Sequence, residues 1–234
     1  MMLGARTAAW AKSVGWVNPY QTDDNALIAM FDGEWNVSGG VHDSNSPVWN
    51  DLVGGRAVNV GEGCSFGDKF FFVGENKNSQ GNFVLENYYS FRIVFRYRSY
   101  ARDGKRIIVT CCPTKRGLRK YVEWIGWSYG LTGLIRDDQL GGWRKPVLVA
   151  VNFKNDNNKN SDVVIQRFPK TTSQTYENWG KDSELYDRFT ILSDSPRTSL
   201  EFYTIQFFNR MLTSDELNIF EEFDKSRFNI PDAS

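Results

Sequence analysis

The longest regular pattern in the sequence runs from Tyr88 to Tyr100, where hydrophobic and polar positions alternate. Every second position is apolar: Phe91, Ile93, Phe95 and Tyr97. The positions between them hold Arg92, Val94, Arg96 and Arg98. A period of two is typical of a β-strand, whose successive side chains point to opposite faces. The segment therefore predicts a strand with one apolar face and one largely cationic face.

Shorter apolar runs with turn signals between them predict further strands. They cover Ala26–Phe31, Lys69–Val73, Lys105–Cys111, Tyr121–Tyr129, Pro146–Phe153, Val163–Phe168 and Leu200–Phe208. Asp103-Gly104 separates the long strand from the next and is a strong hairpin signal. The polar run Asn155–Asn160 predicts a second hairpin loop. Because no helical pattern alternates with these strands, an antiparallel sandwich is favoured over a parallel α/β sheet.

One helix is predicted near the C-terminus. Thr213 can cap its start, and Glu216 three residues later completes a capping box. Leu212 before the cap can pack on Leu217 as a hydrophobic staple. We expect the helix to pack across an end or edge of the sandwich through the apolar face that is formed by Leu217, Phe220 and Phe223.

The composition fits one globular domain that needs no cross-links. The chain has 234 residues, of which 41% are hydrophobic and 15% aromatic, enough to bury a core. Its 28 basic residues balance 28 acidic ones, whereas nucleic-acid-binding proteins are usually basic. Three cysteines (Cys64, Cys111 and Cys112) are too few for a disulfide framework. They indicate a protein made in a reducing compartment.

The start of the chain predicts an irregular arm over residues 1–22, followed by one domain over residues 23–234. The arm carries Trp10 and Trp16, which either pack on the edge of the domain or dock on a partner protein. Arg6 and Lys12 interrupt its apolar residues, so we expect no signal peptide. No run of 18 apolar residues occurs, so we expect no membrane span.

Two segments at the ends of the chain resemble a known family. The first, 26–55, holds Asp32-Gly33, Asn36, His42, Trp49 and Asp51-Leu52. The second, 202–230, holds Asn209-Arg210, Leu212-Thr213 and Glu216. Over about a quarter of the chain, they resemble the laminin G-like members of the concanavalin A-like lectin/glucanase superfamily. The resemblance implies an all-β fold, a two-sheet antiparallel jelly-roll sandwich with one short C-terminal helix, in which the terminal strands pair.

This fold hosts lectins, glycosidases and structural domains, so it does not set the function. Domains with this opening and closing pattern resemble those of tailed-phage virion proteins and bacterial surface proteins, and the missing signal peptide favours the phage side. We therefore expect a non-catalytic structural or interaction domain on a virion assembled in the host cytoplasm, with other virion proteins as partners. The alternative is a lectin-like module that binds host or mucosal glycans, on a bacterial surface or outside the cell.

A glycan site would combine an aromatic platform with polar side chains. Trp143 follows Gly141-Gly142, and Trp179 precedes Gly180, so both are predicted to lie in loops. These two tryptophans are the candidate sugar-stacking residues, although tryptophan is more often a core residue.

Catalysis is not expected. The glycosidases of the superfamily carry an E-x-D-x-x-E motif on a strand, with carboxylates placed for acid/base chemistry. The nearest spacing here is Glu222-Phe223-Asp224, which lies on the predicted helix and has Arg227 at the third carboxylate position. We interpret it as a solvated helix face. The single histidine, His42, is expected to hydrogen-bond within its loop, and one histidine without C-x-x-C does not suggest zinc.

Calcium is the one candidate cofactor, because it binds related lectins and takes six to eight oxygen ligands. The candidate metal ligands are Asp32, Asn36 and Asp43, in a loop that also holds Glu34. The other interpretation is turn chemistry, since Asn and Asp side chains cap their own backbone.

The cationic face of the long strand has three interpretations. It could be a solvated face balanced by acids such as Glu221, Glu222 and Asp224, which we favour. It could contact an acidic neighbouring subunit, or it could bind a polyanion such as nucleic acid. The balanced net charge makes nucleic acid the weakest of the three.

Overall fold

The computed structural model describes residues 18–37, 40–83, 85, 88–99, 107–110, 123–125, 145–153, 161–168, 174–179, 188–193 and 197–230. For residues 107–110, 123–125, 147, 151, 153, 161–168 and 174–179, only the course of the backbone is described. The predicted arm up to residue 17, Trp143 and the predicted loop at 155–160 lie outside these ranges.

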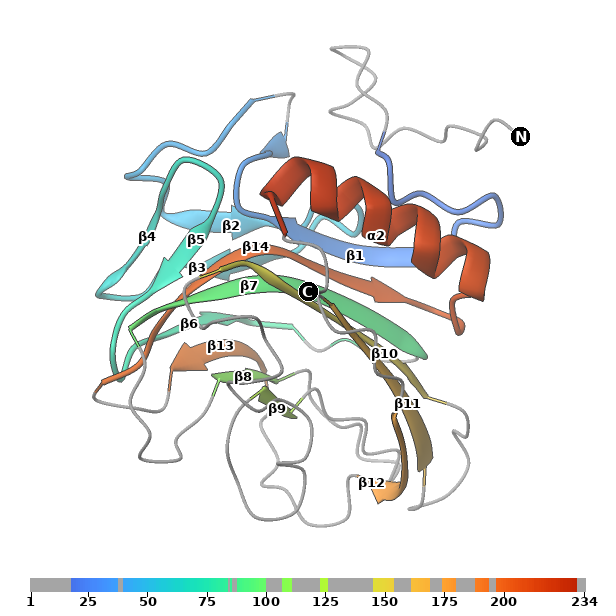
Figure 1. Ribbon diagram of the computed structural model, residues 1–234. Coiled ribbons are helices and arrows are strands. Elements are labelled where there is room, and N and C mark those ends of the chain that lie inside the picture. The colour runs from blue at the N-terminus through green and yellow to red at the C-terminus, as the bar shows by residue number, and fades with distance from the viewer. Residues whose placement is uncertain are drawn as a thin grey trace.

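The larger of two antiparallel sheets has eight strands (Figure 1). They are β1 (Leu27–Asp32), β4 (Cys64–Phe66), β5 (Phe71–Val73), β7 (Ser90–Ser99), β10 (Val147–Phe153), β11 (Ser161–Phe168), β12 (Gln174–Trp179) and β14 (Ser199–Phe208). Their order is β12-β11-β10-β7-β14-β5-β4, and β1 also pairs with β14. The pairing of β1 with β14 confirms that the terminal strands lie side by side.

The smaller sheet has six strands in the order β2-β3-β6-β13-β8-β9. They are β2 (Val48–Asn50), β3 (Ala57–Asn59), β6 (Asn78–Gly81), β8 (Ile107–Thr110), β9 (Glu123–Ile125) and β13 (Phe189–Ser193). The predicted hairpin at Asp103-Gly104 is wrong, because β7 pairs with β10 and β14, whereas β8 pairs with β9 and β13 in the other sheet. Both sides of β7 are therefore paired with other strands of its own sheet, and β8 belongs to the second sheet.

The main core lies between the two sheets, and the apolar face of β7 points into it as predicted. Phe91, Ile93, Phe95 and Tyr97 pack there with residues of β14 and β13, such as Phe207 and Phe189. The ring of Trp49 is fully buried beside Phe71, and its indole N–H donates a 2.7 Å hydrogen bond to the backbone oxygen of Asp32. The predicted all-β sandwich with one C-terminal helix is thus confirmed.

The helix α2 (Ser214–Phe228) begins with the predicted capping box of Thr213 and Glu216. It lies across the outer face of the larger sheet, over β1 and β14, rather than at an end or edge of the sandwich (Figure 1). One cluster beneath it joins Phe220 to Leu27 and Phe208, and another joins Phe228 to residues of β7 and β10. In the part of the chain that the structure describes, no helix is long and apolar enough to cross a membrane.

A buried ion pair connects α2 to the sheet. The Arg92 guanidinium donates from Nη2 to Oδ2 of Asp224 at 2.5 Å and from Nη1 to Oε1 of Gln206 at 2.8 Å. The Tyr20 hydroxyl donates to Oδ1 of Asp224 at 2.5 Å. The side chains of Arg92 and Asp224 are 1% and 0% exposed. The interpretation of these two residues as solvated is therefore wrong, because α2 covers this part of the cationic face of β7.

Residues 18–22, which the sequence assigned to the arm, pack into the folded domain. Tyr20 is fully buried and contacts the rings of Phe220 and Phe223 edge-on. The hydroxyl of Thr22 accepts a 2.7 Å hydrogen bond from the backbone N–H of Ala26. The described domain therefore includes Asn18, and not only residues from 23 onward.

We expect Asp224→Asn to lower the free energy of unfolding by about 3–5 kcal/mol, because it leaves the Arg92 charge buried without a counter-ion. Urea unfolding measures this change. The matched control is Glu222→Gln on the same helix, whose ion pair with Lys225 is largely exposed and should contribute under about 1 kcal/mol. Equal losses in the two variants would contradict the role given to the buried pair.

Candidate functional site

The carboxylate of Asp32, a predicted calcium ligand, binds a guanidinium. Arg227 donates from Nη1 to Oδ2 at 2.7 Å and from Nη2 to Oδ1 at 2.6 Å. Its Nη2 also donates to Oε2 of Glu34 at 3.0 Å. The guanidinium lies 3.3 Å from the ring centroid of Trp35. Both oxygens of Asp32 therefore already face a positive charge, and they tie the end of α2 to the end of β1.

The other two predicted ligands make separate contacts, Asn36 with a residue of β2 and Asp43 within its own turn. Oδ1 of Asn36 accepts from Nδ2 of Asn50 at 2.8 Å, and Oδ1 of Asp43 accepts from the backbone N–H of Asn45 at 2.7 Å. Within the described ranges, no group of three or more His, Cys, Asp or Glu side chains is placed to hold a metal ion. Calcium binding in this loop stays a prediction, and the contacts seen are those of turn chemistry.

His42 is buried by stacking on Phe66, with ring centroids 3.8 Å apart and an interplanar angle of 5°. Neither ring nitrogen has a hydrogen-bond partner among the described residues. The predicted hydrogen bond within the loop is therefore wrong, because the ring is held by packing. Burial lowers the pKa of His42 to about 4, although Asp32 acts in the opposite direction.

Of the two predicted sugar-stacking tryptophans, Trp179 falls within the described backbone. It is the last residue of β12, where it pairs with Ser161 at the edge of the larger sheet. Its assignment to a loop is therefore wrong. Trp143, like Trp10 and Trp16 of the predicted arm, lies outside the described residues.

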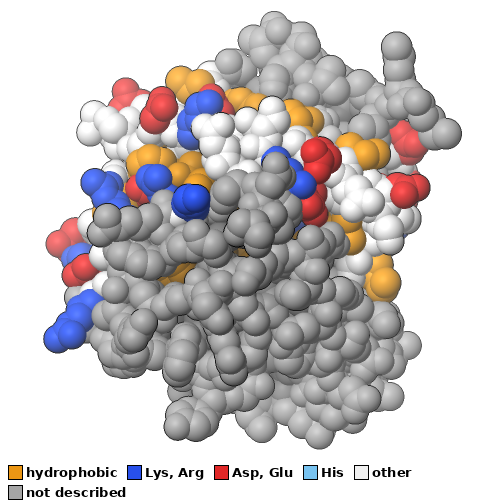
Figure 2. Space-filling model, viewed as in Figure 1, with side chains coloured by type: hydrophobic (Ala, Val, Ile, Leu, Met, Phe, Trp, Pro, Cys, Tyr) orange, Lys and Arg blue, Asp and Glu red, His pale blue; other side chains and the backbone are white. Residues whose placement is uncertain are grey.

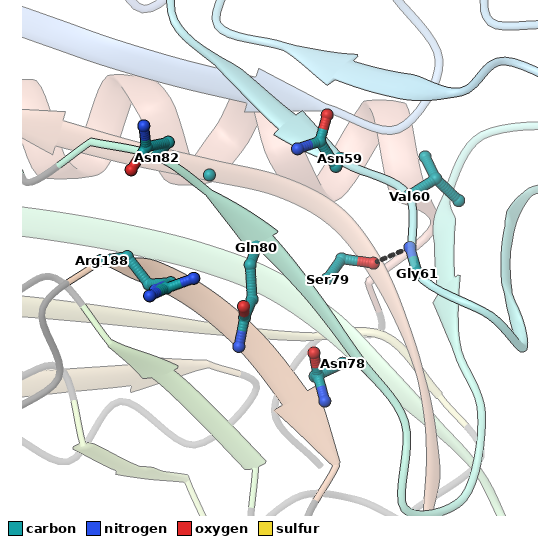
Figure 3. A pocket seen from close by; sticks show the side chains of 9 residues that line it. Asn59, Val60, Gly61, Asn78, Ser79, Gln80, Asn82 and Arg188 are labelled. Carbon is teal, nitrogen blue, oxygen red and sulfur yellow. Dashed lines mark hydrogen bonds between the residues drawn. The ribbon is translucent and has the colours of Figure 1, made fainter.

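A pocket of about 290 Å³ opens on the smaller sheet, between β3, β6 and the residue that precedes β13 (Figure 3). Amide side chains and one guanidinium line most of it: Asn59, Asn78, Gln80, Asn82 and Arg188. These residues meet because of strand geometry. Ser79 of β6 is buried, so Asn78 and Gln80 on either side of it point outward. Gln80 pairs in register with Asn59 of β3.

The pocket is polar, and Arg188 is the one charged side chain among its described lining residues. No side-chain hydrogen bond joins the amides of Asn59, Asn78, Gln80 and Asn82 to other described residues. The hydroxyl of Ser79 accepts a 2.9 Å hydrogen bond from the backbone N–H of Gly61 and so fixes the floor (Figure 3). Each side-chain amide can donate and accept hydrogen bonds. The pocket can therefore bind groups that themselves both donate and accept, such as hydroxyls.

No periodic pattern in the sequence marks this pocket, because β6 reads Asn-Ser-Gln-Gly and has no apolar alternation. The one signal in the sequence is the density of amides between Asn76 and Asn82. Arg188 comes from more than a hundred residues further on, so no local pattern connects it to them.

No protein-family model matches the sequence, and no curated protein matches it. Solved structures do match. The receptor-binding domain of botulinum neurotoxin type G is 13% identical, with a TM-score of 0.51 over 86% of this chain and 51% of that chain. The binding domain of botulinum neurotoxin DC in complex with SialylT is 11% identical, with a TM-score of 0.56 and the same coverage. Trypanosoma rangeli sialidase in complex with sialic acid is 14% identical, with a TM-score of 0.51 over 88% of this chain and 34% of that chain.

At sequence identities of 11–14%, the structural similarity shows only that the fold is shared. The chain spans about half the length of the matched toxin domains and about a third of the sialidase. It is a two-sheet β-sandwich of a kind that occurs in receptor-binding domains.

We expect the free energy of unfolding of the His42→Phe variant to fall less than that of the wild type as the pH is lowered. Between pH 6.5 and about 4, the unfolded chain binds a proton at residue 42 that the folded chain does not, so stability falls as the pH is lowered through this window. The shift corresponds to about 3 kcal/mol at most. Unfolding free energies of both proteins from pH 8 to pH 4 measure the effect, since all other groups cancel in the difference. Parallel profiles would contradict it.

Proposed function

We propose that this chain is a carbohydrate-binding module that recognises a glycan through the amide-lined pocket of the smaller sheet. The observation that carries the proposal is the convergence of four side-chain amides, unpaired among the described residues, on one outward-facing pocket. The proposed activity is binding, not catalysis.

The chemistry of the pocket fits a sugar. Each sugar hydroxyl is both a donor and an acceptor, which matches an Asn or Gln amide group for group. A volume of about 290 Å³ is at the lower end of the range for ligand pockets, so the pocket suits one sugar unit rather than a long oligosaccharide.

The matched structures also favour glycan binding. One is the DC toxin domain in complex with SialylT, and another is a sialidase in complex with sialic acid. Cell entry of botulinum neurotoxin type C, another matched structure, depends on interaction with two ganglioside molecules. Proteins that contain a sandwich of this shape thus include ones that bind glycans. Trp143 and Trp179 stay predictions from the sequence, and neither is among the described lining residues of this pocket.

We expect the protein to bind a subset of glycans on a broad array, and we expect the double variant Asn78→Ala/Gln80→Ala to bind them about tenfold or more weakly. Each lost neutral hydrogen bond contributes about 0.5–1.5 kcal/mol. The matched control is Asn218→Ala, which removes an exposed amide from α2 on the outer face of the other sheet. A flat array, or equal binding by the double variant and the control, would contradict the proposal.

A role as a structural domain of a larger assembly, such as a virion, stays a prediction from the sequence. One observation bears on how it is tested: Tyr20 is anchored on Asp224, so residues 18–22 belong to the domain. A test of the arm should therefore remove residues 1–17 and leave Tyr20 in place.

We expect the full chain to form a defined oligomer and the chain that starts at residue 18 to be monomeric, because the arm would make the contacts. Light scattering after size-exclusion chromatography measures both. The truncated protein should keep the unfolding midpoint of the full chain, whereas removal of residues 1–22 should lower it. The same oligomeric state with and without residues 1–17 would count against the assembly role.

A further inference from the structure

A second pocket, of about 450 Å³, lies on the outer face of the larger sheet, beyond the region that α2 covers. It is lined by Phe70, Arg96, Tyr97, Arg98 and Glu201. Along β7, Arg92 lies buried in its ion pair with α2, whereas the side chains of Arg96 and Arg98 are 34% and 61% exposed. Lys and Arg side chains lie beside hydrophobic ones on the surface over β4 and β5 (Figure 2).

The carboxylate of Glu201 lies much closer to Arg96 than to Arg98. Its Oε2 accepts from Nε of Arg96 at 2.5 Å and from the Tyr203 hydroxyl at 3.3 Å. Its Oε1 lies 3.9 Å from Nη1 of Arg98, which is too far for a hydrogen bond. Arg96 and Glu201 therefore form a closed pair. Neither Arg98, whose side chain is 61% exposed, nor the second oxygen of Glu201, whose side chain is 2% exposed, makes a hydrogen bond to the described residues.

Arg98 is oriented although its guanidinium donates no hydrogen bond to the described residues. The guanidinium lies 5.3 Å from the ring centroid of Phe72, which is close enough for a cation–π interaction. Phe70 contributes an apolar wall, and its ring packs against Tyr203 with centroids 6.1 Å apart. The pocket thus combines an apolar wall, an oriented guanidinium and a carboxylate oxygen that can accept.

We propose that this pocket binds a hydroxylated organic acid, specifically an acidic sugar. Two arginines and one glutamate leave one net positive charge, which one ligand carboxylate would balance. A planar guanidinium matches a carboxylate with two parallel hydrogen bonds, so Arg98 binds the acid group. Oε1 of Glu201 accepts from a hydroxyl of the ligand, and Phe70 contacts the apolar face of its ring.

This site is independent of the amide-lined pocket. The amides lie on the outer face of the smaller sheet, and the arginines lie on the outer face of the larger one. Each pocket has one net positive charge among its described lining residues, but the groups that carry the hydrogen bonds differ: four side-chain amides line the first, whereas two arginines, a glutamate and the ring of Phe70 line the second. The first therefore offers mainly amides to hydroxyls, and the second offers a guanidinium to a carboxylate.

The test is a titration of the full-length protein with glucuronate, glucose and acetate, followed by ligand-observed NMR. We expect saturable glucuronate binding, with glucose and acetate at least about tenfold weaker, because each lacks one of the two recognised groups. Arg98→Gln should weaken glucuronate binding by about tenfold or more, since it removes charge-assisted hydrogen bonds. Because Arg98 is exposed, this variant should keep the unfolding midpoint of the wild type.

Two control variants show whether glucuronate binds at this pocket and not elsewhere on the surface. Lys77→Gln removes one positive charge from a surface ion pair with Glu62 and should leave glucuronate binding unchanged. Gln80→Ala in the amide-lined pocket should also leave it unchanged, so failure of one proposal does not imply failure of the other. Absence of saturable glucuronate binding, full binding by Arg98→Gln, or acetate binding as tight as glucuronate binding would each overturn the proposal.

Discussion

The carboxylate of Asp224 connects three parts of the chain that are far apart in sequence, and the outer face of the larger sheet depends on it. One oxygen binds Arg92 of β7 and the other accepts from Tyr20 near the start of the domain. Burying two charges is costly, and apolar residues of similar volume could fill the same space. Hydrogen bonds are directional, however, so this pair fixes where α2 lies along the sheet, which apolar contacts alone do not.

A second clamp lies three residues further along the helix, near its C-terminal end. Arg227 binds both oxygens of Asp32 and stacks over Trp35. Together the two clamps hold the helix on β1, β7 and β14, and they determine which charged residues remain available for binding. Arg92, Asp32 and Asp224 are engaged in structural ion pairs. Arg98 lies just beyond the covered region, and its guanidinium stays accessible to solvent.

Local patterns predicted the helix and eight of the strands, whereas the short strands β2, β3, β4 and β6, together with β12 and β13, were missed. The pairing of the chain ends was implied by the family resemblance. The alternation in β7 identified its apolar face, and the Thr213 capping box located the start of α2. The same alternation could not show that a helix covers Arg92, because the covering residue lies 132 positions away. Asp103-Gly104 is a valid turn signal, but a turn signal alone does not determine which sheet the next strand joins. The amide-lined pocket was not predictable from a periodic pattern, since β6 turns only a serine and a glycine inward.

The burial of Tyr20 also decides how the molecule can be attached to something else. Because Tyr20 is fixed beside α2, the chain enters the domain on the outer side of the larger sheet (Figure 1). The amide-lined pocket faces away from that side, with both sheets between it and the helix (Figure 3). A tether joined ahead of Asn18 would therefore approach from the rear of the pocket and leave its mouth unobstructed.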